Sequence, residues 1–198
     1  MKRIFRILAK ITLGLIILVV LILFGSYWYI TTEWKRYYSE EEIKSFVKEI
    51  DKAPKLSDTF YGVYDKLHNN DRHKSMTIIY LSVVWNELFM GKRQSQTSWF
   101  VKAAYFFPKK KVRMQYSNFN LAWGLEKYTT PEKCFDFAMS IENIQLTRHD
   151  TTFKDITQIK DTTEILNYIV KTSSPTIYNK NPEKLNQRII ELRKKLNY

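Results

Sequence analysis

The sequence predicts a mostly α-helical domain carried on a single N-terminal transmembrane helix. The first observation is a run of twenty residues without a charge, Ile11–Ile30. The second is the spacing of apolar residues three and four apart along most of the remaining chain, which is typical of helices. With 44% hydrophobic and 15% aromatic residues, the 198-residue chain has enough apolar side chains to form a core rather than stay disordered.

The uncharged run fits a membrane anchor in its length and in its flanks. At about 1.5 Å per helical residue it spans a bilayer core of roughly 30 Å. Trp28 and Tyr29 suit the far interface, where amphipathic rings collect. A cleaved signal peptide is the alternative, but the bulky residues 27–30 make a poor cleavage site. Four basic residues precede the run and predict a cytoplasmic N-terminus: Lys2, Arg3, Arg6 and Lys10.

The anchor divides the chain into four expected segments. These are a basic flank over 1–10, the transmembrane helix over 11–30, a juxtamembrane helix and linker over 31–53, and a folded domain over 54–198. Of the formal charge of +12, four positive charges lie in the flank, which leaves +8 for the rest. Such a surface is attracted to anionic lipid headgroups. Basic proteins often bind nucleic acid, but a domain outside the membrane is not expected to do so.

The juxtamembrane helix has a clear start. Ser39 and Glu42 have the spacing of a capping box, and Pro54 closes the segment. Four apolar residues then fall on one helical face: Ile43, Phe46, Val47 and Ile50.

Two apolar stretches follow in the domain. In "SMTIIYLSVVWNELFM", residues 75–90, Ile78, Leu81, Trp85 and Leu88 form one stripe with Ile79 beside it. We expect this helix to be buried on most sides, because apolar residues surround it. The stretch "SWFVKAAYFF", 98–107, fits a helix or a strand by periodicity, and its two alanines favour a helix.

Four further helices are predicted towards the C-terminus. One runs from about Val112 to Lys127, and the next begins at Pro131 with Thr130 as its cap. A short helix starts near Thr162, and Asn181 followed by Pro182 starts the last one. Cys134 is expected in the core.

Neither a metal site nor a cofactor is expected. Cys134 is the only cysteine, which excludes an intramolecular disulfide and a multi-cysteine metal site. His68, His73 and His149 lack metal-ligand spacing.

Three segments resemble, in order, the family 51 glycosyltransferases, which are the peptidoglycan polymerases. They are "GKRQSQTS" at 91–98, "WGLEKYTTPEKCFDFAMS" at 123–140 and "EILNYIVKTSSPTIYNKNPEKLNQR" at 164–188. The last is the most specific, because it combines a Pro-x-x-Tyr-Asn turn with an Asn-Pro-Glu helix start. The resemblance covers roughly 54–198 and implies a lysozyme-like fold that partly dips into the membrane. It also implies an anchor in a bacterial inner (plasma) membrane with the domain on the outer side.

The resemblance implies a specific chemistry. Family members polymerise lipid II, a disaccharide linked to undecaprenyl pyrophosphate. One glutamate removes a proton from the acceptor hydroxyl, while a second glutamate and basic residues support the departing pyrophosphate. In this sequence the two glutamate positions fall on Tyr64 and Asn118, with Asp65 next to the first. A phenol with an ordinary pKa near 10 is a poor base at neutral pH, and an amide does not ionise.

The resemblance also implies a set of substrate contacts. The basic run 108–113 is either a solvated loop or a contact to a pyrophosphate or headgroup. Gln94, Thr97 and Ser98 keep the polar residues of the family's turn, whereas Lys102 stands where the family has one of a pair of glutamines. With the basic run, the candidate substrate-binding residues are Gln94, Thr97, Ser98, Lys102, Lys109, Lys110, Lys111 and Arg113.

The sequence therefore predicts a non-catalytic relative of these enzymes. Its expected partners are membrane lipid, lipid II or peptidoglycan glycan, and cell-wall synthesis or envelope proteins. The alternative is an active transglycosylase with relocated acids, for which Asp65 is the first candidate. Glu87 and Glu126 are interpreted as structural charges, with Glu126 paired to nearby lysines. A third interpretation is that the resemblance reflects only shared helical packing.

Overall fold

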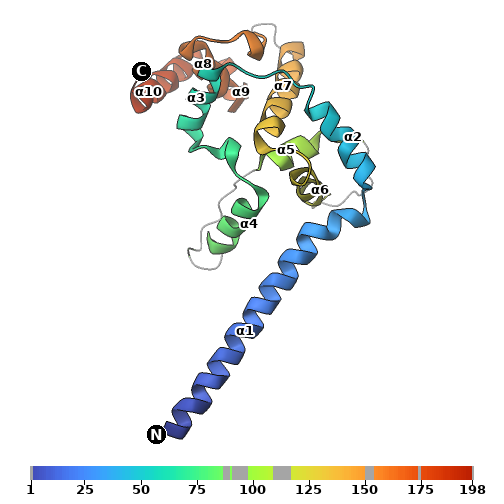
Figure 1. Cartoon of the computed structure of the whole chain (residues 1–198). Coiled ribbons are helices and arrows are strands. Elements are labelled where there is room, and N and C mark those ends of the chain that lie inside the picture. The colour runs from blue at the N-terminus through green and yellow to red at the C-terminus, as the bar shows by residue number, and fades with distance from the viewer. Residues whose placement is uncertain are drawn as a thin grey trace.

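The computed structural model is a mostly helical domain at the end of one long helix (Figure 1). It describes residues 2–86, 90, 98–108, 117–149, 154–173 and 175–197, and within these residues there is no strand. The predicted helical class is thereby confirmed, while the lysozyme-like assignment stays a prediction. In chain order the elements are α1 (Lys2–Thr32), η1 (Glu33–Arg36), α2 (Glu40–Ile50), α3 (Asp58–His68), η2 (Asp71–His73), α4 (Met76–Trp85), α5 (Trp99–Tyr105), α6 (Ser117–Glu126), α7 (Pro131–His149), η4 (Ile156–Gln158), α8 (Thr162–Ser173), α9 (Pro175–Lys180) and α10 (Pro182–Leu196).

Helix α1 projects away from the domain (Figure 1). The segment Lys10–Arg36 is long and apolar enough to cross a membrane, and its most apolar stretch is not buried by any part of the protein. The large apolar side chains from Ile11 to Phe24 are all more than half exposed. A bilayer would cover this surface, which supports the predicted single-pass anchor.

One hydrophobic core joins the elements beyond α1. Trp34 of η1 and Ile43 of α2 are buried in it together with residues of α3–α8 and α10, and Tyr178 of α9 packs against it. The segment 31–53 thus folds as part of the domain. Gly124 of α6 allows η1 to approach closely, because a Cβ atom there would lie 3.1 Å from the Trp34 ring.

The predicted helix caps are confirmed. The N–H of Glu42 donates to Ser39 Oγ at 3.2 Å, and the N–H of Ser39 donates to Glu42 Oε2 at 2.9 Å. At the start of α10, the N–H of Lys184 donates to Asn181 Oδ1 at 3.1 Å. The stretch at Pro175, which the resemblance makes a turn, forms the short helix α9.

The predicted burial of α4 is wrong. Met76 and Ile79 are buried, but Ile78, Leu81 and Trp85 are 55%, 58% and 59% exposed. Leu88 and Glu87 lie outside the described residues. An apolar pattern on all sides favours any apolar surroundings, so it does not distinguish a protein interior from lipid.

Helix α4 is tied to the end of α1 that enters the domain. The hydroxyls of Tyr27 in α1 and Thr77 in α4 share a hydrogen bond at 3.0 Å. The ring of Tyr27 also lies 6.3 Å from the ring of Tyr80. Since Tyr27 belongs to the last turn of the uncharged run, these contacts place the start of α4 at the level where α1 would leave the bilayer.

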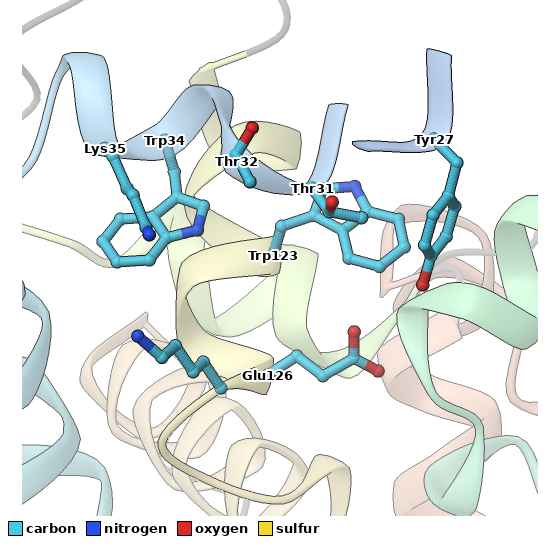
Figure 2. A pocket seen from close by; sticks show the side chains of 8 residues that line it. Tyr27, Thr31, Thr32, Trp34, Lys35, Trp123 and Glu126 are labelled. Carbon is cyan, nitrogen blue, oxygen red and sulfur yellow. The ribbon is translucent and has the colours of Figure 1, made fainter. Parts of the chain in front are cut away.

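A pocket of about 280 Å³ lies where α1 and η1 meet α6 (Figure 2). The side chain of Glu126 in its wall accepts a hydrogen bond from the N–H of Met76 at 2.8 Å. Glu126 therefore has the predicted structural role, but it caps the start of α4, and no lysine forms an ion pair with it in the part of the chain that the structure describes. The lining residues are Tyr27, Thr31, Thr32, Trp34, Lys35, Trp123, Glu126 and Lys127.

Candidate functional site

Tyr64, at the position implied for the catalytic base, is part of the core. It is 8% exposed, and its ring stacks on His68 with centroids 4.2 Å apart. The rings of Phe135 in α7 and Trp99 in α5 lie 4.7 Å and 5.9 Å away. Burial raises the pKa of Tyr64 well above its ordinary value, and nearby acids raise it further. The phenol therefore stays protonated at neutral pH and cannot act as a general base.

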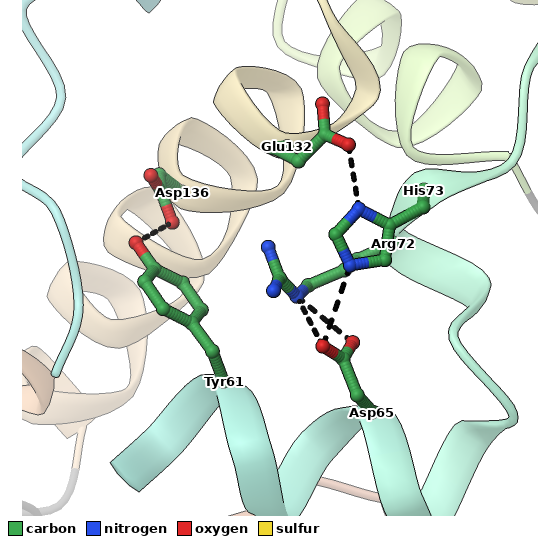
Figure 3. Close-up of polar contacts among 6 residues, drawn as sticks. All are labelled: Tyr61, Asp65, Arg72, His73, Glu132 and Asp136. Atoms are coloured by element: carbon green, nitrogen blue, oxygen red, sulfur yellow. Dashed lines mark hydrogen bonds and ion pairs between the residues drawn. The ribbon is translucent and has the colours of Figure 1, made fainter. Parts of the chain in front are cut away.

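Asp65 is held in an ion pair (Figure 3). Arg72 Nε donates to both of its carboxylate oxygens, at 2.8 Å and 2.9 Å, and His73 Nε2 lies 3.4 Å from Oδ2. The Asp65 and Arg72 side chains are only 16% and 14% exposed. Asp65 therefore lies in α3 in a largely buried ion pair, so it is not a free carboxylate next to the implied base position.

The turn after α3 brings these partners together. Asn69 and Asn70 both adopt left-handed backbone conformations, with φ angles of 52° and 58°. Asparagine tolerates this conformation better than most residues. The chain reverses there, and η2 returns Arg72 and His73 to the side of α3 that carries Asp65.

The same cluster reaches α7 (Figure 3). His73 Nδ1 lies 2.6 Å from Glu132 Oε1, and Tyr61 Oη donates to Asp136 Oδ1 at 2.8 Å. The Arg72 guanidinium lies over the Tyr61 ring, 4.5 Å from its centre. These contacts link α3, η2 and α7, so the cluster holds the fold together.

Asp136 makes this cluster sensitive to pH. Burial raises its pKa to about 6, against the opposing effects of the Tyr61 hydrogen bond and the charge of Arg72. Because the folded chain holds this proton more tightly than the unfolded chain, the contribution of Asp136 to stability falls as pH rises from about 4 to about 6.

We expect Asp136→Asn to stabilise the protein at neutral pH by about 1–3 kcal/mol, because it removes a buried charge and keeps an acceptor for Tyr61. Urea unfolding in mild detergent, followed by circular dichroism on both sides of this pH window, measures the effect. The variant should lose less stability than the wild type as pH rises. A variant that is less stable than wild type at neutral pH would contradict this assignment.

The other predicted site residues are spread over the chain. Ser98 is 1% exposed and caps α5 by accepting a hydrogen bond from the N–H of Phe100 at 3.2 Å, so it is not available to a substrate. Asn118 lies in the first turn of α6, whereas the ring partners of Tyr64 come from α3, α5 and α7. Six predicted contacts lie outside the described residues: Gln94, Thr97, Lys109, Lys110, Lys111 and Arg113.

Lys102 faces an acid that the sequence analysis missed. Its ammonium lies 3.8 Å from the centre of the Trp99 ring, and burial lowers its pKa. Glu142 of α7 attracts it electrostatically, and burial raises the pKa of that carboxyl group. Among the described residues Glu142 has no hydrogen bond or ion pair within bonding distance. It borders an open pocket of about 570 Å³ lined by Glu142, Gln145, Leu146, Arg148 and Thr172.

Comparisons with known proteins identify no relative of this chain. No family model and no curated protein matches the sequence, and no solved structure matches the fold. The resemblance to family 51 glycosyltransferases thus rests on the sequence motifs, and the proposals below rest on those motifs and on the geometry described above.

Proposed function

We propose that this chain is a non-catalytic, membrane-anchored relative of the peptidoglycan glycosyltransferases. It holds lipid II or a related lipid-linked glycan at the outer face of a bacterial plasma membrane. In that position it presents the precursor to cell-wall synthesis or envelope proteins.

The proposal is based mainly on the burial and pairing of the two residues at and next to the implied base position, Tyr64 and Asp65. Tyr64 is a buried phenol with a raised pKa, and Asp65 is committed to Arg72. A general base must be deprotonated and within reach of the hydroxyl that it activates. Neither side chain meets both conditions, so the chemistry of the family has no proton acceptor at this position.

The apolar face of α4 supports a location on the bilayer surface. Ile78, Leu81 and Trp85 expose it on the side of the domain from which α1 projects (Figure 1). The hydrogen bond between Tyr27 and Thr77 joins the start of α4 to the end of the uncharged run of α1. A domain held in this way lies at the level of the phosphate groups and sugars of a lipid-linked precursor. Its net positive charge attracts the phosphate groups.

Glu142 favours a second candidate function, an active transglycosylase with a relocated acid. It combines an accessible pocket, a raised carboxyl pKa and a nearby cation, Lys102. A carboxyl group of this kind suits proton transfer, and a lysine suits a pyrophosphate leaving group.

A lipid II turnover assay distinguishes the non-catalytic function from the active transglycosylase. We expect the purified full chain to release no glycan polymer when it is incubated with lipid II in detergent, because no acceptor for the proton stands at the implied base position. A family 51 enzyme is the positive control. Polymer that disappears with Glu142→Gln, but persists with the exposed control Glu41→Gln, would establish the second function and refute the first.

A further inference from the structure

We propose that the pocket between α1, η1 and α6 binds the headgroup of a phospholipid that carries a phosphate and a primary amine, as in phosphatidylethanolamine. This inference is independent of the proposed function, because it requires only that α1 spans a bilayer. The ligand is a single lipid seated at the junction of anchor and domain.

The charges in the pocket match a zwitterion. The Lys35 ammonium points towards one end of the pocket and the Glu126 carboxylate towards the other (Figure 2). Lys127 also lines the pocket, but Glu40 lies 3.0 Å from its ammonium and balances its charge. Lys35 has no carboxylate partner among the described residues. A phosphate near Lys35 and an ammonium near Glu126 would each form an ion pair with the side chain of opposite charge. A simple anion would instead be repelled by Glu126.

The position of Glu126 adds a reason for a cation. Its carboxylate is half-buried, and desolvation raises its pKa although the N–H groups of Met76 and Thr77 donate to it. A bound ammonium would offset this desolvation by supplying the missing opposite charge. Such a group would also lie between the aromatic rings that line the pocket, which attract cations.

The depth and size of the pocket point to a lipid headgroup. Tyr27 and Thr31 line it from the end of the uncharged run, at the level where the headgroups of a bilayer around α1 would lie. Its volume of about 280 Å³ is sufficient for a phosphate and an ethanolamine unit.

Native mass spectrometry of the full chain tests the proposal. The protein is reconstituted in nanodiscs that contain equal amounts of phosphatidylethanolamine, phosphatidylglycerol and phosphatidylcholine, and the lipids that stay bound after release are identified. We expect about tenfold more bound phosphatidylethanolamine than phosphatidylcholine, because a trimethylated amine cannot donate hydrogen bonds to Glu126. Equal retention of these two lipids, or a preference for phosphatidylglycerol, would overturn the proposal.

Two variants and their controls assign the effect to the pocket. Glu126→Gln keeps an acceptor for Met76 and should lower phosphatidylethanolamine retention about tenfold, and Lys35→Gln should lower retention of both phosphatidylethanolamine and phosphatidylglycerol. The exposed controls Glu41→Gln and Lys48→Gln should change neither. Retention unchanged in both pocket variants would refute the site. Soluble phosphoethanolamine is the remaining arm: if it binds as tightly as the lipid, the ligand is not membrane-borne and the proposal fails.

Discussion

Replacing Arg72 with methionine should destabilise the domain by about 3 kcal/mol, because it leaves the largely buried Asp65 carboxylate without its principal partner. It also removes the guanidinium that lies over the Tyr61 ring. Urea unfolding of the full chain in mild detergent, followed by circular dichroism, measures the loss. The matched control is Arg188→Met, which breaks an exposed pair with Glu191 on α10 and should cost well under 1 kcal/mol.

The double variant Asp65→Asn/Arg72→Met identifies the cause of the destabilisation expected for Arg72→Met. If the cost arises from an unpaired charge, replacing Asp65 with a neutral amide in the Arg72→Met background should restore part of the lost stability. An Arg72→Met protein as stable as wild type would show that the Asp65 carboxylate does not depend on Arg72 as its partner. In that case it would again be a candidate base, contrary to our interpretation.

A spin label at position 81 should report a lipid environment when the full chain is in vesicles. Leu81 is 58% exposed on the apolar face of α4, next to a helix that would span the bilayer. Burying an exposed leucine in an apolar medium stabilises a protein by about 1.5–3 kcal/mol, and Ile78 and Trp85 add to this. The label is introduced as Leu81→Cys, since Cys134 is buried and burial raises the pKa of its thiol. We expect high collision rates with oxygen and low rates with a water-soluble nickel chelate.

Ile190 of α10 supplies the matched position for this measurement. It is 53% exposed, and a label introduced as Ile190→Cys should show the opposite pattern, because α10 packs against α3, α8 and α9 at the end of the domain away from α1 (Figure 1). Equal, water-like behaviour at both positions would contradict the placement of α4 on the bilayer.

Local signals in the sequence predicted most of the helices. Ser39 with Glu42, and Asn181 with Pro182, start their helices as expected, because capping depends on side chains within one turn. The same holds for the buried stripe of α2, whose spacing alone determines which face is apolar. The exposure of α4 could not be predicted in this way, because it depends on which surfaces the rest of the fold leaves uncovered.

The site was less predictable because it depends on long-range partners. Asp65 pairs with Arg72 only because two consecutive asparagines reverse the chain between them. Glu142 was missed because its distinguishing features are its pocket and the absence of a close partner among the described residues, and neither is visible in the sequence. Tyr64 was predicted at the implied base position, but its burial against Trp99 and Phe135 follows from the packing of three helices.

Binding of lipid II to the full chain in nanodiscs is the most direct test of the proposed function. A fluorescent lipid II is titrated into the discs, and the bound lipid is recovered and examined by electrophoresis. The account predicts saturable binding, stronger than that of a phospholipid with the same label, and recovery of lipid II unchanged. Conversion of the bound lipid II to polymer, or binding no stronger than that of the labelled phospholipid, would contradict it.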